Sequence, residues 1–231
     1  MKEKIINIGV DIETLSTLPT AAIVSIAAKE FSLDETDDNY FVKQFKVNIN
    51  ATSCALNNYH IETETCQWWS ERSDSAKDAV LNGDLKNIKD ALQMFRNWVL
   101  ETLEESKSDE VHVWMQGTDF DGSVLRYALR KEFPELGRKA VPWKHDALRD
   151  SRTYILESVR LLYGEVEDPY SVIPKPKNTL IFHDPMGDVD QMIWNIQYIH
   201  KALKEKVKQV VDFERGEDDS APTIDKKGGQ S

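Results

Sequence analysis

The strongest constraint on the fold is an apolar, Ile- and Val-rich run at residues 4–14 that ends in two acids. Such a run favours a buried, central β-strand. Side chains two residues apart on a strand point to the same side of the sheet, so Asp11 and Glu13 share one face where the strand ends. Two like charges there favour a cation, and carboxylate oxygens suit Mg²⁺ or Mn²⁺. Taken alone, ordinary surface acids at a strand end would explain the pair.

The rest of the hydrophobic pattern predicts an α/β architecture. Apolar runs at 21–31 and 39–49 follow the first over short connections, which indicates a three-strand antiparallel meander. Strands first, followed by alternating helices and strands, favour helices packed around a mixed sheet. The later elements are expected as a strand over 110–117, a Pro-rich loop over 164–182, and helices over 63–73, 85–106, 120–133, 146–163 and 188–205.

Size and composition indicate one domain without a membrane segment. The chain has 231 residues and a mass of 26.5 kDa, enough for a core that needs no disulfides. It contains no apolar run of about 18 residues and no signal-peptide pattern at its start, and Cys54 and Cys66 read as reduced thiols. We therefore expect a cytoplasmic protein, with a domain over 1–211 and a disordered tail over 212–231, where the apolar periodicity ends.

The net charge of −11 argues against a general nucleic-acid binder, which would carry a basic face. It does not exclude an enzyme that holds only a few nucleotides at a strand end. Such an enzyme makes few phosphate contacts, and bound metal ions cancel part of its acidic charge.

Two further acids and a histidine are candidates for the same metal site. Asp121 opens a predicted helix directly after a strand, and Asp188 lies near the start of the last predicted helix, five residues after His183. Acids at helix starts are also common for capping and dipole reasons alone, and a lone histidine is most often structural. The combination with Asp11 and Glu13 is what indicates a site for two hard cations and a water.

Three blocks, "VDIET", "DFDGSVL" and "HDPMGD", resemble in order and spacing the motifs of the DEDD exonucleases, in the subtype that carries a histidine. "CQWWSER" and "ALRDSRTYI" resemble segments of the branch related to RNase AS. The similarity spans roughly residues 5–203. It implies a ribonuclease H-like fold with a mixed five-stranded sheet, made of the meander plus parallel strands and flanked by helices.

The resemblance also implies an activity and its residues. The expected reaction is 3′–5′ exonuclease hydrolysis of single-stranded DNA or RNA to 5′-mononucleotides. The resemblance assigns His183 as general base and makes four acids the ligands of two divalent cations, Mg²⁺ or Mn²⁺: Asp11, Glu13, Asp121 and Asp188. His145 and Asp150 repeat the histidine-to-aspartate spacing, but Asp150 falls in the block already matched to "ALRDSRTYI", and His183 and Asp188 begin the final helix, where the family has them.

Candidate substrate contacts rest on general chemistry. Aromatic side chains stack bases, arginines hold phosphate, and residues just beyond the first acids could line the terminal nucleotide. A Trp pair on a short helix also fits core packing. The candidates are Leu15, Ser16, Trp68, Trp69, Arg149 and Arg152.

Several alternatives stay open at this point. The activity could be that of an oligoribonuclease or proofreading subunit acting on short fragments. A catalytically silent module that binds nucleic-acid ends or a protein, or an acidic interaction protein, would need none of the five site residues. The sequence does not choose between DNA and RNA, and a homodimer is possible because relatives of this kind are often dimers.

Overall fold

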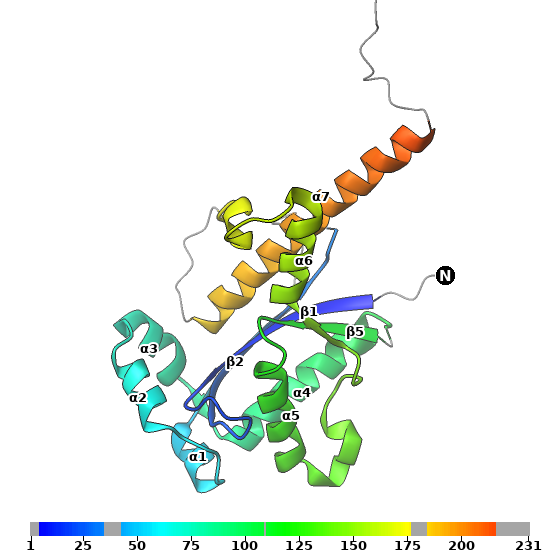
Figure 1. Ribbon diagram of the computed structural model, residues 1–231. Coiled ribbons are helices and arrows are strands. Elements are labelled where there is room, and N and C mark those ends of the chain that lie inside the picture. Colours follow the sequence, from blue (N-terminus) through cyan, green and yellow to red (C-terminus); the bar gives the residue numbers. More distant parts are fainter. Residues whose placement is uncertain (1–4, 35–42, 109, 177–183, 216–231) are drawn as a thin grey trace, which may run out of the picture.

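The computed structural model of the chain describes residues 5–34, 43–108, 110–176 and 184–215. They form a six-stranded sheet flanked by helices on both faces (Figure 1). The strand order is β4-β3-β2-β1-β5-β6. The strands are β1 Ile5–Thr14, β2 Ile23–Phe31, β3 Gln44–Ile49, β4 Leu85–Lys86, β5 Glu110–Met115 and β6 Leu148–Asp150.

The meander and the parallel strands lie as the sequence predicts. Strand β2 pairs antiparallel with both β1 and β3, while β5 runs parallel to β1 on its other side. Strand β1 is therefore central, which agrees with its continuous apolar run. The sheet has six strands rather than the expected five, because β4 and β6 add parallel edge segments of two and three residues.

Because of these short strands, two helices begin later than the sequence predicts. The helix expected over 85–106 begins later, because residues 85–86 pair with β3 and Asn87 takes the N-cap position. The helix expected over 146–163 begins at Ser151, because residues 148–150 pair with β5 and the Asp150 side chain caps the helix through Thr153 N. In both places an available sheet edge prevails over the helical pattern.

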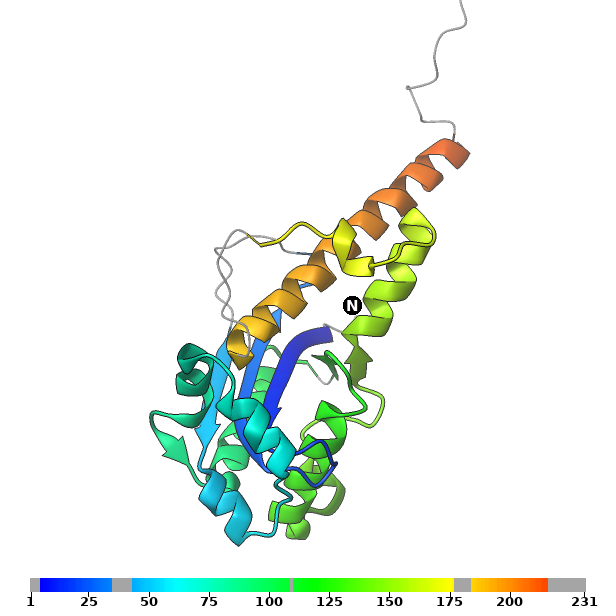
Figure 2. The same cartoon turned by 60° about the vertical axis from the view of Figure 1, so that its left-hand side comes forward.

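Two helical layers cover the sheet (Figures 1 and 2). The larger core joins α4 and α5 to one face, and the smaller clusters join α6 and α7 to the other. The helices are α1 Ala51–Leu56, α2 Thr63–Ser70, α3 Asp74–Leu81, α4 Ile88–Glu105, α5 Asp121–Glu132, α6 Ser151–Tyr163 and α7 Pro185–Arg215, with 3₁₀ turns η1 Pro134–Ala140 and η2 Pro169–Val172.

Helix α7 begins and ends beyond the range that the sequence predicts. It starts at Pro185, a residue that suits the first turn because its missing N–H would have no helical acceptor. It continues to Arg215, four residues past the expected domain boundary at 211. The far half of the helix projects beyond the layers (Figure 2). None of the described helices combines the length and apolar character needed to cross a membrane.

Candidate active site

Strand β1 sorts its side chains between the two faces of the sheet. Ile6, Ile8, Val10 and Ile12 belong to the larger core. The alternate residues must point the other way, toward α7. On that face the side chain of Asn7 accepts a hydrogen bond from Trp114 Nε1 at 2.9 Å. Asp11 and Glu13 lie on the same face, where the strand ends.

Gly9 sets how closely α7 approaches this face. A Cβ atom at Gly9 would lie 3.0 Å from Met192 Cε and 3.2 Å from two side-chain carbons of Ile193. The helix therefore packs directly on the strand backbone. This close packing carries the first turns of α7, with Asp188, to the end of β1.

Three carboxylates converge at that point. Oxygens of Asp11, Glu13 and Asp188 lie within 4.8 Å of one another. Asp121, in the first turn of α5 and 7% exposed, adds a fourth charge: it is the strongest charged neighbour of Asp11. We call these four residues the acid cluster. Residues that are far apart in the sequence thus meet where the central strand β1 ends.

The electrostatics of the acid cluster favour cations. Burial, followed by the charges of Asp121, Glu13 and Asp188, raises the pKa of Asp11 well above its ordinary value. Burial, followed by the charges of Asp188, Asp121 and Asp184, raises the pKa of Glu13 to about 8. Burial raises the pKa of Asp121 to about 7, partly offset by the positive charge of Arg152. Carboxylates that repel one another in this way are suited to hold hard divalent cations, and their oxygen donors fit Mg²⁺ or Mn²⁺.

Two more aspartates flank Asp188, and each pairs with a lysine. Lys46 Nζ lies 2.5 Å from Asp184 Oδ1, and Lys29 Nζ lies 2.7 Å from Asp190 Oδ1. The charge of Asp184 also contributes to the raised pKa of Asp11 and Glu13, so it lies close to the acid cluster. The two ion pairs join the start of α7 to β2 and β3 on either side of Asp188.

Residues 6–170 match the family described as the 3′-5′ exoribonuclease Rv2179c-like domain. This match covers more than half of the chain. The chain belongs to this family. The exonuclease family that the three motif blocks predict is thereby confirmed, and no curated protein sequence matches the chain.

Solved structures of exonuclease I share the fold of this Rv2179c-like domain. E. coli exonuclease I in complex with a dT13 oligonucleotide has a TM-score of 0.54 and 15% identity, over 90% of this chain and 44% of that one. A second exonuclease I structure, described as suggesting how processivity is achieved, also gives 0.54 and 15%, over 92% and 44%. The ribonuclease H-like fold is thus confirmed, and the chain spans less than half the length of these relatives.

The histidine expected as general base, His183, lies outside the described residues. The competing pair can be placed. Asp150 accepts hydrogen bonds from Thr153 N at 2.8 Å and Thr118 N at 3.0 Å, so its carboxylate caps α6 and holds the loop that leads to Asp121. His145 is exposed, and its backbone oxygen accepts from Arg126.

The residues just after the first acids point inward in the Rv2179c-like domain. Leu15 is 8% exposed and belongs to the larger core. The Ser16 hydroxyl is buried, lies 2.8 Å from His60 Nδ1 and accepts from Leu18 N. Both side chains therefore support the loop after β1, and their expected contact with a terminal nucleotide stays a prediction.

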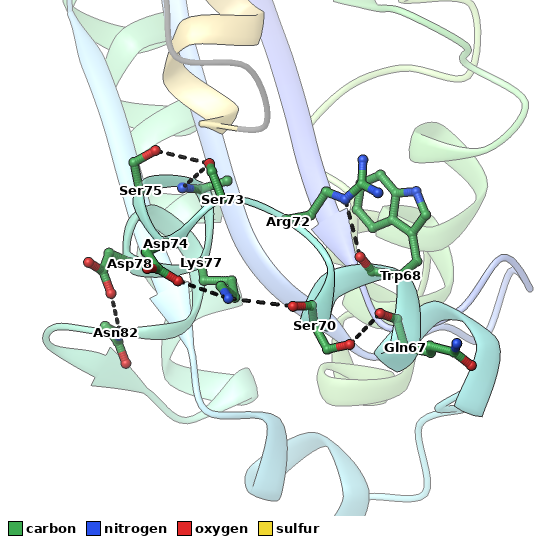
Figure 3. A network of polar contacts seen from close by, with 11 residues as sticks. Gln67, Trp68, Ser70, Arg72, Ser73, Asp74, Ser75, Lys77, Asp78 and Asn82 are labelled. Atoms are coloured by element: carbon green, nitrogen blue, oxygen red, sulfur yellow. Dashed lines mark hydrogen bonds and ion pairs between the residues drawn. The ribbon is translucent and has the colours of Figure 1, made fainter.

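The two tryptophans of α2 have different surroundings. Trp69 is 3% exposed and donates from Nε1 to Thr14 O at 3.0 Å, which ties α2 to the end of β1. Trp68 is 37% exposed, and Arg72 lies over its ring with Cζ 4.3 Å from the centroid (Figure 3). Arg72 was not singled out from the sequence. Its place four residues after Trp68, one helical turn on, is the signal that could have found it.

The two arginines of the "ALRDSRTYI" segment are separated in space. Arg152 reaches the loop before Asp121: its Nη1 would be 3.4 Å from a Cβ at Gly117, and its charge lowers the pKa of Asp121. Arg149 instead donates to the backbone oxygens of Asp146 and Leu148 and lines a pocket with the start of β5. Of the two, Arg152 has the better place for a substrate contact near the acid cluster.

Proposed function

We propose that the chain is a metal-dependent 3′–5′ exonuclease that releases 5′-mononucleotides from a single-stranded 3′ end. One observation carries the proposal: Asp11, Glu13 and Asp188 present oxygens within 4.8 Å of one another, in a chain of the Rv2179c-like family. The electrostatic influence of Asp121 on Asp11 and Glu13 supports a four-acid site. All four acids are the residues expected from the sequence.

In the proposed mechanism the acid cluster holds two divalent cations. When bound, the cations supply Lewis acidity to the attacking water and to the leaving 3′ oxygen. Asp11, Glu13, Asp121 and Asp188 fix the positions of the cations from three separate elements. His183, as general base, takes a proton from the water that attacks phosphorus. Direct attack by water inverts the configuration at phosphorus and needs no covalent enzyme intermediate.

The first test replaces one carboxylate. Asp11→Asn keeps the shape of the side chain and removes a charge that the cations need, so we expect kcat to fall by roughly a thousandfold or more, because each metal ligand contributes to transition-state stabilisation. Turnover of a 5′-labelled oligonucleotide with Mn²⁺ measures the effect. Asp74→Asn, on the exposed surface of α3, is the matched control. Wild-type turnover by a folded Asp11→Asn variant would refute the assignment.

For the substrate, we propose RNA, with a base stacked on Trp68. The family description names exoribonucleases, whereas the similar E. coli exonuclease I was solved with a DNA oligonucleotide. Trp68 offers a half-exposed ring, and the guanidinium of Arg72 lies over it, so a base can stack on this pair while its phosphate contacts Arg72. The ring of Trp69 packs at 5.2 Å and 89° against that of Trp68 and holds it in place.

Matched single-stranded RNA and DNA, each from two to about twenty nucleotides long, test this proposal. Faster cleavage of DNA would reverse the choice of sugar, and activity on only the shortest fragments would favour an oligoribonuclease.

Trp68→Ala should raise KM by roughly 5- to 150-fold, the equivalent of one lost stacking contact. Tyr163→Ala removes a similarly exposed ring on α6 and is the control.

A cytoplasmic location and a homodimer stay predictions, and sedimentation velocity tests the homodimer.

A further inference from the structure

The pocket that Arg149 lines lies at the side of the sheet where β5 and β6 pair. Its volume is about 380 Å³, and it is enclosed by the last turns of α4, the start of β5 and the segment 138–149. Five cationic side chains line it against two carboxylates, Glu110 and Asp146, in a chain whose net charge is −11. These cations are Arg96, Arg138, Lys139, Lys144 and Arg149. We call this site the basic pocket.

Backbone oxygens, and no acidic side chains, hold the two central guanidinium groups. Arg96 donates from Nε and Nη2 to Lys139 O at 3.4 and 3.2 Å, and Arg149 donates from Nη1 to Asp146 O at 2.6 Å. Within the described residues neither arginine forms an ion pair. Both charges are therefore held in place without being neutralised, an arrangement that suits an anion with several oxygens.

The positive field of the basic pocket is also felt by a neighbouring histidine. His112, on β5, lines the pocket, and burial lowers its pKa. The charge of Arg149 lowers it further. The carboxylates of Glu110 and Asp146 act in the opposite direction, and the pKa of His112 stays lowered overall.

Trp143 forms part of the wall of the basic pocket, and most of its side chain is buried behind that wall. Trp143 is 8% exposed, and its Nε1 has no hydrogen-bond partner among the described residues. Its ring packs edge-on against Phe95, with centroids 6.1 Å apart. A buried N–H without an acceptor is uncommon and costly. Apolar side chains, including Leu100 and Val141, form the rest of the wall.

We propose that the basic pocket binds a nucleoside 5′-monophosphate. The phosphate would lie on Arg96, Arg138 and Lys139, and the base would lie against the apolar wall, of which Trp143 is part. Arginine and apolar or aromatic surfaces together are what single nucleotides require. The choice of a nucleotide rests on the proposed function, because a nucleoside 5′-monophosphate is the product of the proposed reaction. The pocket itself does not depend on that function.

The basic pocket and the acid cluster are far apart. Ile5 pairs with Glu110, so the pocket lies beside the start of β1. Asp11 is six residues further along that strand, about 20 Å at the usual rise per residue. Nucleotide bound in the basic pocket therefore leaves the acid cluster open to substrate.

The test uses the indole N–H of Trp143 as the probe. The ¹⁵N-labelled full chain is titrated with AMP and CMP in EDTA, so that metal-dependent binding at the acid cluster does not contribute. The Trp143 resonance, identified from Trp143→Phe, should shift and saturate below millimolar nucleotide. No shift at several millimolar, or the same affinity for inorganic phosphate alone, would overturn the proposal.

Arg138 and Lys139 are exposed, so replacing both of them should disturb folding least. Arg138→Ala/Lys139→Ala should weaken the apparent Kd at least roughly tenfold, since two charge-assisted contacts are lost. Lys201→Ala/Lys206→Ala removes two exposed charges from α7 and should bind as the wild type does. Equal weakening in both double variants would mean nonspecific attraction and would contradict a built site.

The outcome is separable from that of the proposed function. Asp11→Asn should lose nuclease activity and keep nucleotide binding in EDTA. A chain that cleaves 3′ ends but shows no shift of Trp143 contradicts the basic pocket alone. A chain that binds nucleotide but cleaves nothing contradicts the exonuclease alone.

Discussion

At the scale of single residues, the acid cluster works against the stability of the metal-free chain. Asp11 and Glu13 are half-buried and face further carboxylates, and their pKa values rise as a result. The pKa of Glu13 reaches about 8 and that of Asp121 about 7. The folded chain at neutral pH therefore retains protons that the unfolded chain gives up.

This difference predicts how stability changes with pH. Between the ordinary acid pKa values near 4 and the folded values of about 7 and 8, the folded chain binds more protons than the unfolded one. The free energy of unfolding in EDTA should thus fall as pH rises from 5 to 8, by at most about 1.4 kcal/mol per pH unit for each group. Urea unfolding at fixed ionic strength measures it.

The matched control is Asp11→Asn/Glu13→Gln, which removes two of the repelling charges and should flatten the pH dependence. Saturating Mn²⁺ should raise the stability of the wild type most at pH 8, where the carboxylates are free to bind it. A metal-free stability that rises across this pH range would contradict the assigned environment.

Single residues also show where sequence reasoning stops. The positions of the four acids at a strand end and at helix starts could be predicted by local rules, but their role as metal ligands came from their combination and from the family resemblance and stays a prediction. Trp68 and Trp69 could not be told apart, since either fits one face of a short helix. A contact between Trp69 Nε1 and Thr14 O, 55 residues away, decides which ring is buried.

At the scale of elements, α7 is held to the sheet by close contact and by charge. Gly9 allows the helix to touch the strand backbone, while Lys29–Asp190 and Lys46–Asp184 join its first turns to β2 and β3. Such partly exposed ion pairs contribute little stability each. Their position on either side of Asp188 suggests that their main role is to orient that acid.

Gly9→Ala tests this packing. The added methyl group would lie 3.0 Å from Met192 Cε and 3.2 Å from two carbons of Ile193, so these side chains must give by a few tenths of an ångström. We expect a loss of about 1–3 kcal/mol in the free energy of unfolding, with a smaller effect on kcat because the two side chains belong to the helix that carries Asp188. Chemical denaturation and single-turnover cleavage measure the two effects.

Met192→Ala supplies the matched double-mutant cycle, because it removes the atom that the new methyl group meets. The cost of Gly9→Ala should be clearly smaller in that background. Additive effects would show that the clash with Met192 is not the cause. Gly83→Ala, where no atom lies within 4 Å of the added Cβ, would not be a neutral control because its φ of +94° strains any side chain.

The elements that could not be predicted are the two short parallel strands. Strand β4 has two residues and β6 three, too few to carry a period of their own. Each exists because a neighbouring strand offers an open edge. The long helices α4, α5 and α7 and the three meander strands could be predicted because their apolar residues repeat over several turns or pleats.

At the scale of the whole molecule, the far half of α7 adds exposed surface without adding core. Val207, Val210 and Phe213 are 61%, 48% and 74% exposed, and the helix projects past the layers (Figure 1). By contrast, Ile196 and Ile199 are fully buried. The part of α7 that the fold requires therefore ends shortly after Ile199.

Removal of residues 207–231 should leave the free energy of unfolding within about 0.5 kcal/mol of that of the full chain, because none of the described side chains over 207–213 is buried. Exonuclease activity should also be unchanged. Thermal unfolding and cleavage assays measure both. A cut before Ile196 is the contrasting control and should abolish cooperative unfolding. A loss above 2 kcal/mol on removing 207–231 would contradict this division of the helix.

The distance in sequence between Asp11 and Asp188 has a consequence for protein synthesis. The ribosome finishes β1 long before it makes the start of α7, and the acid cluster needs both. Closing so long a loop is slow and occurs late in folding. A nascent chain thus has no complete acid cluster, and under the proposed function no cleavage activity, until the start of α7 has been made and has packed on β1.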